Sequence, residues 1–594
     1  MLVPSSRPKA HARIAQLAGE QDWPQALSFA RAVLRKWPDE AAALELAAMA
    51  ASHLGQAAEA ARHYQRLYAL HPEAHGLLMP LGRALADAGK LAEAIKVFRQ
   101  RLHYAPDDLA ALVGLGQVLA MSDLAQDSAE IWREVLRRAP ELPEAWSGLG
   151  IVSEQLGDFE QAESALMRAL ALNAGLIGAA SRLSSVLLHK KDYASALHWA
   201  LHALEREPDF AEARLHAGVA LFELEQWPQA EACLRPLAAA QDSPLALAAA
   251  FNLGSICAVC QREEEAEAWL SEVIERAPAH AVAKMSRGMM RLTRGRLAEG
   301  WADFEARLAA EAGQFRTSHS ASLPLWQGED LAGARLLVAT EQGYGDLLQF
   351  GRFVARLRAL SCARIGLLCR PPLARLMATL DGPDELVVDE ANNPTGDWDY
   401  YLPVMSLPHR LGLHRLEDLQ RPPYLHADPT AAAIWRSRWA GRAVGLVWRG
   451  DAAHRNDRAR SMAGPAEFSP LAALTSVRWV NLQKDATAPE TAAFAAIFRD
   501  SLNPAAELSD FADTAALVSA LDLVITVDTA VAHLAGALGR PAWVLLPWIG
   551  CDWRWLRDRA DSPWYDSVRL YRQPREGDWA SVIAAVKRDL AALG

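Results

Sequence analysis

No uncharged apolar run in this sequence reaches about 18 residues, the length at which a membrane-spanning helix is expected. The first residues, MLVPSSRPKAHARI, also lack the apolar core of a secretory signal peptide. Cysteine is scarce, with six scattered residues in 594, which argues against a disulfide-stapled secreted scaffold. We therefore expect reduced thiols, no membrane span and a cytoplasmic protein.

The sequence also lacks an excess of basic charge and several familiar site motifs. Lys and Arg number 61 against 72 Asp and Glu, and the net charge of -11 argues against nucleic acid as the main partner. There is no Walker-type phosphate loop and no Gly-x-Ser-x-Gly elbow. No cluster of His, Cys and Asp has metal-ligand spacing, so no metal or other cofactor is expected. Cys257 and Cys260 fall inside an expected helix with no second pair nearby, and core packing is the better interpretation.

The first half of the chain has a clear internal repeat. The composition of the whole chain, 51% hydrophobic and 22% charged, is that of a soluble globular protein, and the length of 594 residues predicts two or three domains. Small residues recur 24 positions before a series of prolines, and larger residues such as Tyr64, Phe98 and Trp132 follow the small ones by 16 positions. The prolines have a period of 34 residues and are Pro38, Pro72, Pro106, Pro140 and Pro208, with Ala174 in place of one proline and Pro278 resuming after a two-residue insertion.

This pattern predicts a stack of antiparallel helix pairs. Small residues stand where two helices cross closely, bulky residues fill the space beside them, and proline ends the second helix. One pair cannot bury its own apolar face, so neighbouring pairs stack into a superhelix. The pattern resembles the tetratricopeptide repeat, and about nine units fit into residues 1–312. That resemblance implies a groove that holds a segment of another protein; a purely structural or oligomerising arm is the alternative.

The second half predicts two α/β lobes after a connector at 313–330, because apolar strand candidates alternate with helical stretches. The fold class is therefore an α-helical repeat superhelix followed by two Rossmann-like α/β lobes. The first lobe, 331–425, has strand candidates at 335–340, 363–369 and 385–388. The second lobe, 426–594, has strand candidates at 443–448, 477–482, 523–527 and 543–546, and a last amphipathic helix at 579–593.

Polar turns follow two of the expected strands. In the first lobe, the turn from Glu341 to Asp346 leads into a helix. In the second, Asp528 and Thr529 stand between a buried strand and a helix that carries His533. The free N–H groups and the dipole at a helix N-terminus favour an anion, and His533, one helical turn after Thr529, can face the same ligand. An ordinary strand-to-helix turn capped by Asp528 is the alternative.

These turns resemble those of heptosyltransferase-type glycosyltransferases. That family has a Gly-Asp turn after its first strand and an Asp-Thr-x-x-x-His turn late in its second lobe. This chain has Gly345-Asp346 and Asp528-Thr529-Ala530-Val531-Ala532-His533. The resemblance covers about 331–575 and implies the two-lobed GT-B fold, a nucleotide-sugar donor, metal-independent transfer and Asp346 as the general base. It also implies a final helix that braces the first lobe.

Sugar transfer requires an activated acceptor hydroxyl and a stabilised phosphate leaving group. We expect Asp346 to be the catalytic base, with a helix cap as its alternative role, and Gly343 and Gly345 to let the backbone approach the substrate. Asp528 is expected to cap its helix, since a carboxylate repels an anion. The remaining donor-binding candidates are Thr529, His533 and the N–H groups of Ala530 and Val531, together with Arg449, His454, Arg458 and Lys484, for which a solvated surface role is the alternative.

The full layout resembles bacterial tetratricopeptide-repeat glycosyltransferases, among them flagellin glycosyltransferases. It predicts a protein O-glycosyltransferase whose repeats hold an acceptor protein, with flagellin as the leading acceptor and a CMP-linked nonulosonic acid, such as pseudaminic acid, as the leading donor. Two alternatives remain: a heptose or hexose transferase that acts on a glycan or on other proteins, and a binding scaffold whose transferase domain has lost activity. Trp553 and Trp555 are expected either to stack on the nucleotide or sugar or to pack between the lobes.

Overall fold

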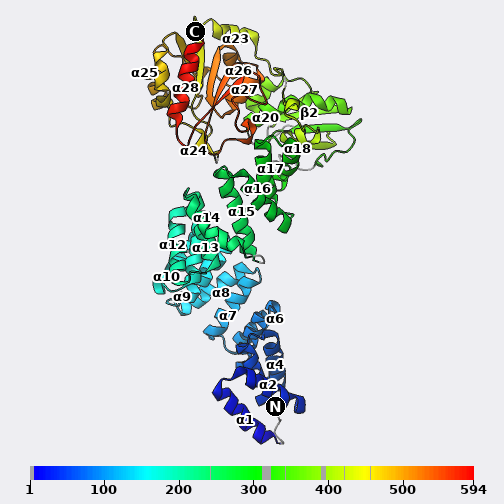
Figure 1. The fold of residues 1–594 in the computed structure, drawn as a ribbon. Helices are drawn as coiled ribbons and strands as arrows, with labels where there is room; N and C mark the ends of the chain where they lie inside the picture. The colour runs from blue at the N-terminus through cyan, green and yellow to red at the C-terminus, as the bar shows by residue number, and fades with distance from the viewer. Residues whose placement is uncertain are drawn as a thin grey trace. The chain divides into compact units, whose positions relative to one another are not determined.

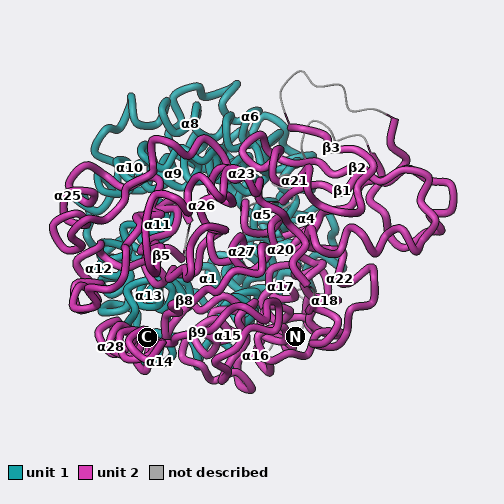
Figure 2. Tube along the Cα trace, turned by 90° about the horizontal axis from the view of Figure 1, so that it is seen from above, with its two compact units in different colours: residues 1–249 teal, residues 250–594 magenta. Residues whose placement is uncertain are grey.

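The computed structural model describes residues 6–240, 243–310, 323–341, 343–389, 397–420, 422–454 and 456–593. Figure 1 shows helices in the blue-to-green part of the chain and strands in the green-to-red part. By compactness the chain divides into two units, Met1–Ala249 and Ala250–Gly594, which have different colours in Figure 2. Residue 312, the expected end of the repeats, lies outside the described residues. Residues 313–322, most of the expected connector, lie outside the described residues.

The first unit consists of helices that pair in sequence, as the repeat predicts, and each pair also contacts the next. Together with the α/β half described below, this confirms the predicted fold class. The helices are α1 (Arg7–Glu20), α2 (Trp23–Lys36), α3 (Ala41–His53), α4 (Ala57–Leu70), α5 (Leu78–Asp87), α6 (Leu91–Tyr104), α7 (Leu109–Met121), α8 (Ala125–Arg138), α9 (Pro143–Gln155), α10 (Phe159–Leu172), α11 (Ile177–His189), α12 (Tyr193–Arg206), α13 (Ala211–Glu223) and α14 (Trp227–Ala238), with a 3-10 turn η1 (His75–Leu77).

Close helix crossings explain the small residues of the repeat. A Cβ added at Gly82 in α5 would come 2.7 Å from the Phe98 ring of α6, and a Cβ at Gly114 in α7 would meet the same ring at 2.7 Å. Phe98 itself is buried. Real Cβ atoms do not approach ring carbons so closely in a packed interior, so the bulky side chain requires glycine on both sides.

The second unit begins inside the repeat array, and its last repeat is built into the α/β half. Trp301 is buried in one apolar core with both lobes, and its indole N–H donates to the Leu413 carbonyl at 2.9 Å. Arg307 is also buried and donates from Nε and Nη2 to the two carboxylate oxygens of Glu341, each at 3.0 Å. The repeat helices of this unit are α15 (Pro244–Val259), α16 (Glu263–Arg276), α17 (Ala281–Thr293), α18 (Leu297–Phe304) and α19 (Arg307–Ala310).

The first sheet has four parallel strands in the order β3-β2-β1-β4. Its register pairs Val338 with Leu367 on one side and with Leu402 on the other, which makes β1 an interior strand. Ligands of such sheets bind beyond the carboxyl ends of the strands, and β1 leads there into the turn that ends at Asp346. The strands are β1 (Arg335–Ala339), β2 (Arg364–Cys369), β3 (Glu385–Val388) and β4 (Tyr400–Pro403).

The second sheet has five parallel strands in the order β6-β5-β7-β8-β9. Every residue of the central strand β7 is buried, as expected where helices cover both faces of a parallel sheet, and its carboxyl end leads into Asp528. The strands are β5 (Arg442–Val447), β6 (Val477–Asn481), β7 (Leu523–Val527), β8 (Ala542–Leu546) and β9 (Val568–Arg572).

Short helices and 3-10 turns connect these strands. Those of the first lobe are α20 (Tyr344–Phe350), η2 (Gly351–Leu360), η3 (Pro371–Leu373), α21 (Ala374–Met377), η4 (Val404–Ser406), α22 (Leu407–Arg410) and η5 (Leu416–Asp418). Those of the second lobe are α23 (Pro429–Arg436), α24 (Asp457–Arg460), η6 (Pro465–Ala473), α25 (Ala488–Ile497), η7 (Ala505–Glu507), α26 (Phe511–Ala520), α27 (Ala530–Ala537), η8 (Trp553–Trp555) and α28 (Trp579–Ala592).

The last helix, α28, packs differently from the expectation. It was expected to brace the first lobe, but its buried side chains, Val582, Ile583, Val586 and Leu590, join the core of the second lobe. Its main neighbours are η6 and β9 of that same lobe. The reason is local: β9 adds an apolar edge to the second sheet, and α28 follows β9 directly and covers it.

Candidate active site

The two turns singled out in the sequence lie side by side. Gly343 is the N-cap residue of α20 in the first lobe, Thr529 is the N-cap residue of α27 in the second, and the two helices pack against each other. A Cβ added at Gly345 would come 3.1 Å from the Cδ2 of His533 and 3.7 Å from the Cα of Ala530. The fold therefore brings together two motifs that are almost two hundred residues apart, and glycine permits this approach.

Asp346, the candidate base, has both carboxylate oxygens engaged. Its Oδ2 accepts from the Gly343 N–H at 2.9 Å, which caps the start of α20. Its Oδ1 accepts from Nη2 of Arg554 at 2.6 Å, and its side chain is 15% exposed. The helix cap expected as an alternative role is thus present, and the carboxylate also faces the second lobe.

Arg554 is a functional candidate that sequence reasoning missed. Besides Asp346, its guanidinium donates to both oxygens of Asp552, at 2.9 and 3.0 Å, and to Oε1 of Gln349 at 2.8 Å. Burial lowers the pKa of Arg554, but the charges of Asp552 and Asp346 outweigh burial and raise it above its ordinary value. Arg554 therefore stays a cation at the junction of the lobes. It stands between Trp553 and Trp555, in a segment interpreted only through its aromatic residues.

The N-terminus of α27 offers free hydrogen-bond donors. Among the described residues, the N–H groups of Ala530 and Val531 donate to no acceptor, and both residues are only partly buried. Thr529 is the N-cap residue, but its hydroxyl lies 2.9 Å from the hydroxyl of Thr526 and does not cap the helix. This arrangement can bind an anion through the backbone and the helix dipole.

Asp528 does not cap α27, contrary to expectation, because the N-cap position belongs to the next residue. Its side chain is buried, and burial, followed by the nearby Asp552 charge, raises its pKa to about 6. Arg460 and Arg554 oppose this shift through their positive charges. The indole N–H of Trp555 lies near enough to lower the pKa of Asp528, although its hydrogen-bond geometry is poor and it has no other partner among the described residues.

His533 is buried and points toward the first lobe. Its ring stacks on Trp555 with centroids 5.2 Å apart, and its Nδ1 lies 3.1 Å from the hydroxyl of Tyr565. Burial, followed by the positive charges of Arg554 and Arg352, holds its pKa well below the ordinary value. At neutral pH His533 is therefore an uncharged imidazole, which can still donate or accept a hydrogen bond.

The other basic candidates have partners elsewhere. Arg449 donates to Asp485 at 2.6 Å and to Glu490 at 3.1 Å, and it is the main cause that lowers the pKa of Glu490 to about 2. Lys484 is exposed and donates to the Ser509 carbonyl at 3.2 Å. His454 and Arg458 are exposed in the loop before and within α24. Donor binding by these four residues stays a prediction.

Trp553 and Trp555 fill the interior. Trp553 packs edge-on against Trp301 of α18, with ring centroids 5.4 Å apart. Trp555 is fully buried beneath His533. Both side chains therefore pack in the interior, which is one of the two roles expected from the sequence.

One Asp-x-Asp sequence, Asp397-Trp398-Asp399, lies at the wrong edge of the first sheet for catalysis. Arg335, at the start of β1, donates to Asp399 from Nη2 at 2.9 Å and from its backbone N–H at 2.8 Å. These bonds lower the pKa of Asp399 to about 2. Among the described residues, no group of three or more His, Cys, Asp and Glu side chains is arranged to hold a metal ion.

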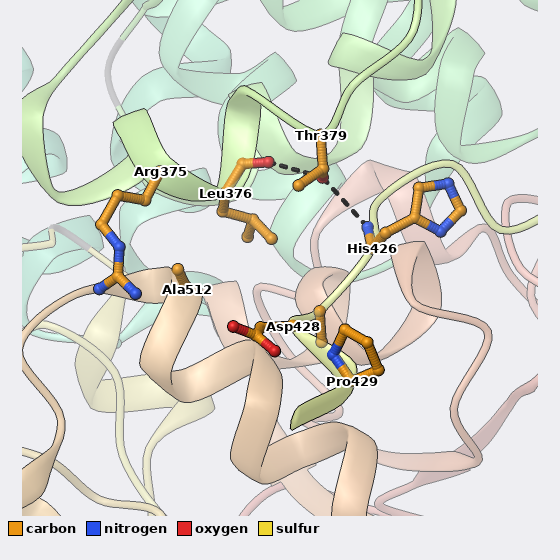
Figure 3. A pocket seen from close by; sticks show the side chains of 8 residues that line it. Arg375, Leu376, Thr379, His426, Asp428, Pro429 and Ala512 are labelled. Atoms are coloured by element: carbon orange, nitrogen blue, oxygen red, sulfur yellow. Dashed lines mark hydrogen bonds between the residues drawn. The ribbon is translucent and has the colours of Figure 1, made fainter. Parts of the chain in front are cut away.

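A cavity of about 300 Å³ lies beside the segment that crosses from the first lobe to the second (Figure 3). Thr379 accepts there from the His426 N–H at 3.1 Å. Arg375, which lines the cavity, pairs with Asp510 and Asp513 at 3.0 and 3.1 Å. No residue of the two turns lines this cavity, so it is distinct from the candidate site.

Comparisons with known proteins agree with both halves. Tetratricopeptide repeat models match residues 16–75, 119–177 and 215–281, and a second model of that repeat matches 51–119. The model of glycosyltransferase family 9 (heptosyltransferase) matches residues 484–545. That match begins at Lys484 and includes the whole turn from Asp528 to His533, whereas Asp346 lies outside it.

Individual relatives cover only parts of the chain. Protein FlbA of Caulobacter vibrioides is 28% identical over 344 residues, which are 52% of this chain and 56% of FlbA, so the chain spans little more than half of that relative's length. A solved tetratricopeptide repeat protein from Parabacteroides merdae is 16% identical with a TM-score of 0.34, over 42% of this chain and 97% of that one. MamA from Desulfovibrio magneticus is 22% identical with a TM-score of 0.27, over 29% of this chain and 96% of that one.

Together these findings describe a chain with tetratricopeptide repeats followed by an α/β half that contains a heptosyltransferase-type segment. They support a transferase. In the part of the chain that the structure describes, no helix has the length and apolar character required to span a membrane.

Proposed function

We propose that this chain is a glycosyltransferase that moves a sugar from a nucleotide donor to a Ser or Thr hydroxyl of a protein held by its repeats. The close approach of Gly345 to His533 carries the proposal. It places a carboxylate, Asp346, beside a helix N-terminus with two free N–H groups and a neutral imidazole. The family 9 match over the second turn supports the same reaction class.

The chemistry requires one bond to form and one to break. The acceptor oxygen bonds to the anomeric carbon, and the bond from that carbon to the donor's phosphate oxygen breaks, with its electron pair leaving on the phosphate. Asp346 takes the proton of the acceptor hydroxyl as general base. The N–H groups of Ala530 and Val531, the Thr529 hydroxyl and His533 stabilise the charge that develops on the phosphate. This proposal requires no metal ion.

Each oxygen of Asp346 already accepts one hydrogen bond, and an acceptor hydroxyl would share or replace one of these donors. Gly343 occupies Oδ2 and Arg554 occupies Oδ1. The Arg554 contact joins the two lobes, so a small relative movement of the lobes would release Oδ1 toward the acceptor. Arg554 would then remain as a fixed positive charge near the leaving group.

The proposed acceptor is flagellin, and the proposed donor is a CMP-linked nonulosonic acid of the pseudaminic acid type. Both rest on the resemblance of the full layout to repeat-containing bacterial glycosyltransferases. The tetratricopeptide repeats support a protein acceptor, because stacked repeats present an extended surface for another chain.

A second candidate function is transfer of heptose or hexose to a glycan or to other proteins, which the heptosyltransferase description of the matched family favours. It predicts that transfer survives removal of the repeat arm. A truncation that tests it should begin at Pro244, the start of α15, and not after residue 312, because Trp301 and Arg307 belong to the core of the α/β half.

A nucleotide panel measured by calorimetry on the full chain tests the proposal. CMP, UDP, ADP and GDP are compared for the wild type and for His533→Ala. CMP binding that the substitution weakens supports the nonulosonic acid donor, and a preference for UDP or ADP favours hexose or heptose. Absence of binding to every nucleotide would overturn the enzyme proposal and favour a binding scaffold.

A further inference from the structure

Tyr565 holds one nitrogen of the imidazole that faces the candidate site. Its hydroxyl lies 3.1 Å from Nδ1 of His533, and both side chains are buried. The opposite edge of the ring faces the first lobe: a Cβ at Gly345 would stand 3.1 Å from Cδ2 and 3.8 Å from Nε2. Among the described residues, Nε2 has no hydrogen-bond partner. This unpartnered polar atom of a side chain that is only 5% exposed therefore points at the turn that carries Asp346.

A fixed group of side chains lies behind Tyr565. The hydroxyl of Tyr424 donates to the Leu348 carbonyl at 2.6 Å and accepts from Nη2 of Arg352 at 3.0 Å. The Arg352 guanidinium stacks over the Tyr565 ring at 4.3 Å and donates to the Trp564 carbonyl at 2.6 Å. Arg352 is buried and, in the described part of the chain, pairs with no carboxylate. This scaffold fixes the position of Tyr565.

A neutral imidazole carries one ring proton, and two arrangements satisfy the contact with Tyr565. In the first, the Tyr565 O–H donates to Nδ1 and the ring proton stands on Nε2. In the second, Nδ1–H donates to the Tyr565 oxygen, and Nε2 presents a bare lone pair toward the site. A lone pair at that position would repel the negative phosphate that the N-terminus of α27 attracts, whereas an N–H would bind it.

We propose that Tyr565 is a positioning residue that fixes His533 in the tautomer with its proton on Nε2, so that this N–H donates to the donor's phosphate. The inference rests on the proposed function and deepens it. It assigns His533 the role of a neutral donor to the leaving group, set by a hydroxyl outside the turn motif. Tyr565 itself touches no substrate.

The tautomer is read directly by ¹⁵N NMR on the full chain labelled at histidine nitrogens. His533→Gln identifies the resonances of this residue by their disappearance. The expected result is a protonated Nε2 and an unprotonated Nδ1 in the wild type, with and without CMP, UDP, ADP or GDP. A proton on Nδ1 overturns the proposal, and this measurement requires no folded Tyr565 variant.

Affinity measurements with the same nucleotides separate positioning from packing. Tyr565→Phe should lower the affinity for the nucleotide that the wild type binds by about tenfold. This is the cost expected when one hydrogen bond to a charged group is no longer oriented. His533→Gln places an amide N–H near the position of Nε2–H and does not depend on a tautomer. In that background Tyr565→Phe should change affinity by less than about twofold. Equal losses in both backgrounds would indicate a packing effect and overturn the positioning role.

Tyr571→Phe is the matched control. Tyr571 is also a buried tyrosine of the second lobe, and its hydroxyl lies 3.0 Å from Asp589. Its loss should leave nucleotide affinity and the His533 resonances unchanged. Failure of the inference is distinguishable from failure of the proposed function. If His533→Ala leaves every affinity unchanged, the donor site itself is wrong; if it weakens binding while Tyr565→Phe does not, only the positioning role is wrong.

Discussion

Arg554 and Asp346, which are 208 residues apart in the sequence, form an ion pair of 2.6 Å across the junction of the two lobes. Their side chains are only 11% and 15% exposed. Because of this pair, the candidate base Asp346 belongs to the contact between the lobes, and the proposed acceptor would have to reach Asp346 at that same contact. Stability and turnover therefore depend on the same few atoms, and variants can separate the two.

Asp346→Asn should abolish sugar transfer while nucleotide affinity stays within about twofold. The amide keeps the shape of the side chain but cannot accept the acceptor's proton, and loss of a general base costs about 10²–10⁴ in rate. Turnover and calorimetry on the same preparation measure the two effects. Asp418→Asn, which changes another carboxylate that accepts from the backbone N–H three residues before it, is the control and should leave turnover intact. Transfer that persists in Asp346→Asn would assign the base elsewhere.

Arg554→Gln should destabilise the α/β half by about 3–5 kcal/mol, because it leaves Asp346 and Asp552 partly buried without their cation. The midpoint of thermal unfolding measures this effect. Arg559→Gln removes an exposed pair with Asp561 and should shift the midpoint little. Arg554→Lys keeps the charge but not the planar fork, so it should lie between the wild type and the glutamine variant. A midpoint for Arg554→Gln equal to that of the wild type would contradict the burial of the pair.

Asp528→Asn should stabilise the protein above pH 6 and not at pH 4. Folding raises the pKa of Asp528 from 3.8 to about 6, so the folded state binds this proton more tightly than the unfolded chain. The free energy of unfolding therefore falls as the pH rises from 3.8 to 6. Above pH 6 the ionised Asp528 lowers it by about 3 kcal/mol. Thermal unfolding of variant and wild type between pH 4 and 7.5 measures the difference.

His533 also contributes to the pH dependence of stability, and its lowered pKa has the opposite consequence. The unfolded chain binds the His533 proton more tightly, so this group destabilises the fold as pH falls below about 6.5. His533 is present in both proteins, and its contribution cancels in the difference between Asp528→Asn and the wild type. A difference that does not change between pH 4 and pH 7.5 would mean that Asp528 is not the titrating group.

Gly345→Ala should reduce turnover by about tenfold to a hundredfold. The added methyl would stand 3.1 Å from the His533 ring and would push the two turns apart, and misplacement of about 1 Å in an active site has a cost of this size. Turnover at saturating donor measures the effect. Gly178→Ala is a matched control, because a Cβ there meets nothing within 4 Å. Normal turnover in Gly345→Ala would show that the turns do not act together.

The sequence was sufficient to predict every element that has a local signature. The repeat helices follow from small residues such as Gly82 at close crossings, and the buried strand before each turn follows from a continuous apolar run. Two strands were missed. Strand β9, with Arg569 exposed between Val568 and Leu570, alternates as an edge strand does, and β4 is a short run that ends in Pro403. Neither has the continuous apolar pattern of a central strand.

The site was only half predictable for a different reason. The turn residues Asp346, Thr529 and His533 are marked by what stands next to them in the chain. The contacts that make Arg554 and Tyr565 site candidates are with Asp346 and His533, which are distant in the sequence. An arginine among tryptophans gives no local signal of such a contact. Arg449 shows the same limit, since its basic loop suggests a ligand and does not reveal that Asp485 and Glu490 are its partners in the fold. Pairing partners, unlike helix starts, are set by the tertiary fold.

The repeats from α15 onward have a consequence for how such chains diversify. Since Trp301 and Arg307 are anchored in the α/β core, an arm joined at Pro244 leaves that core whole, while one joined at residue 312 would remove part of it. A recombination event at the start of α15 can thus supply new recognition helices to an unchanged catalyst. Under the proposed function, target choice and sugar chemistry would be inherited as separate modules, and the same crossover point would let an engineer redirect one without rebuilding the other.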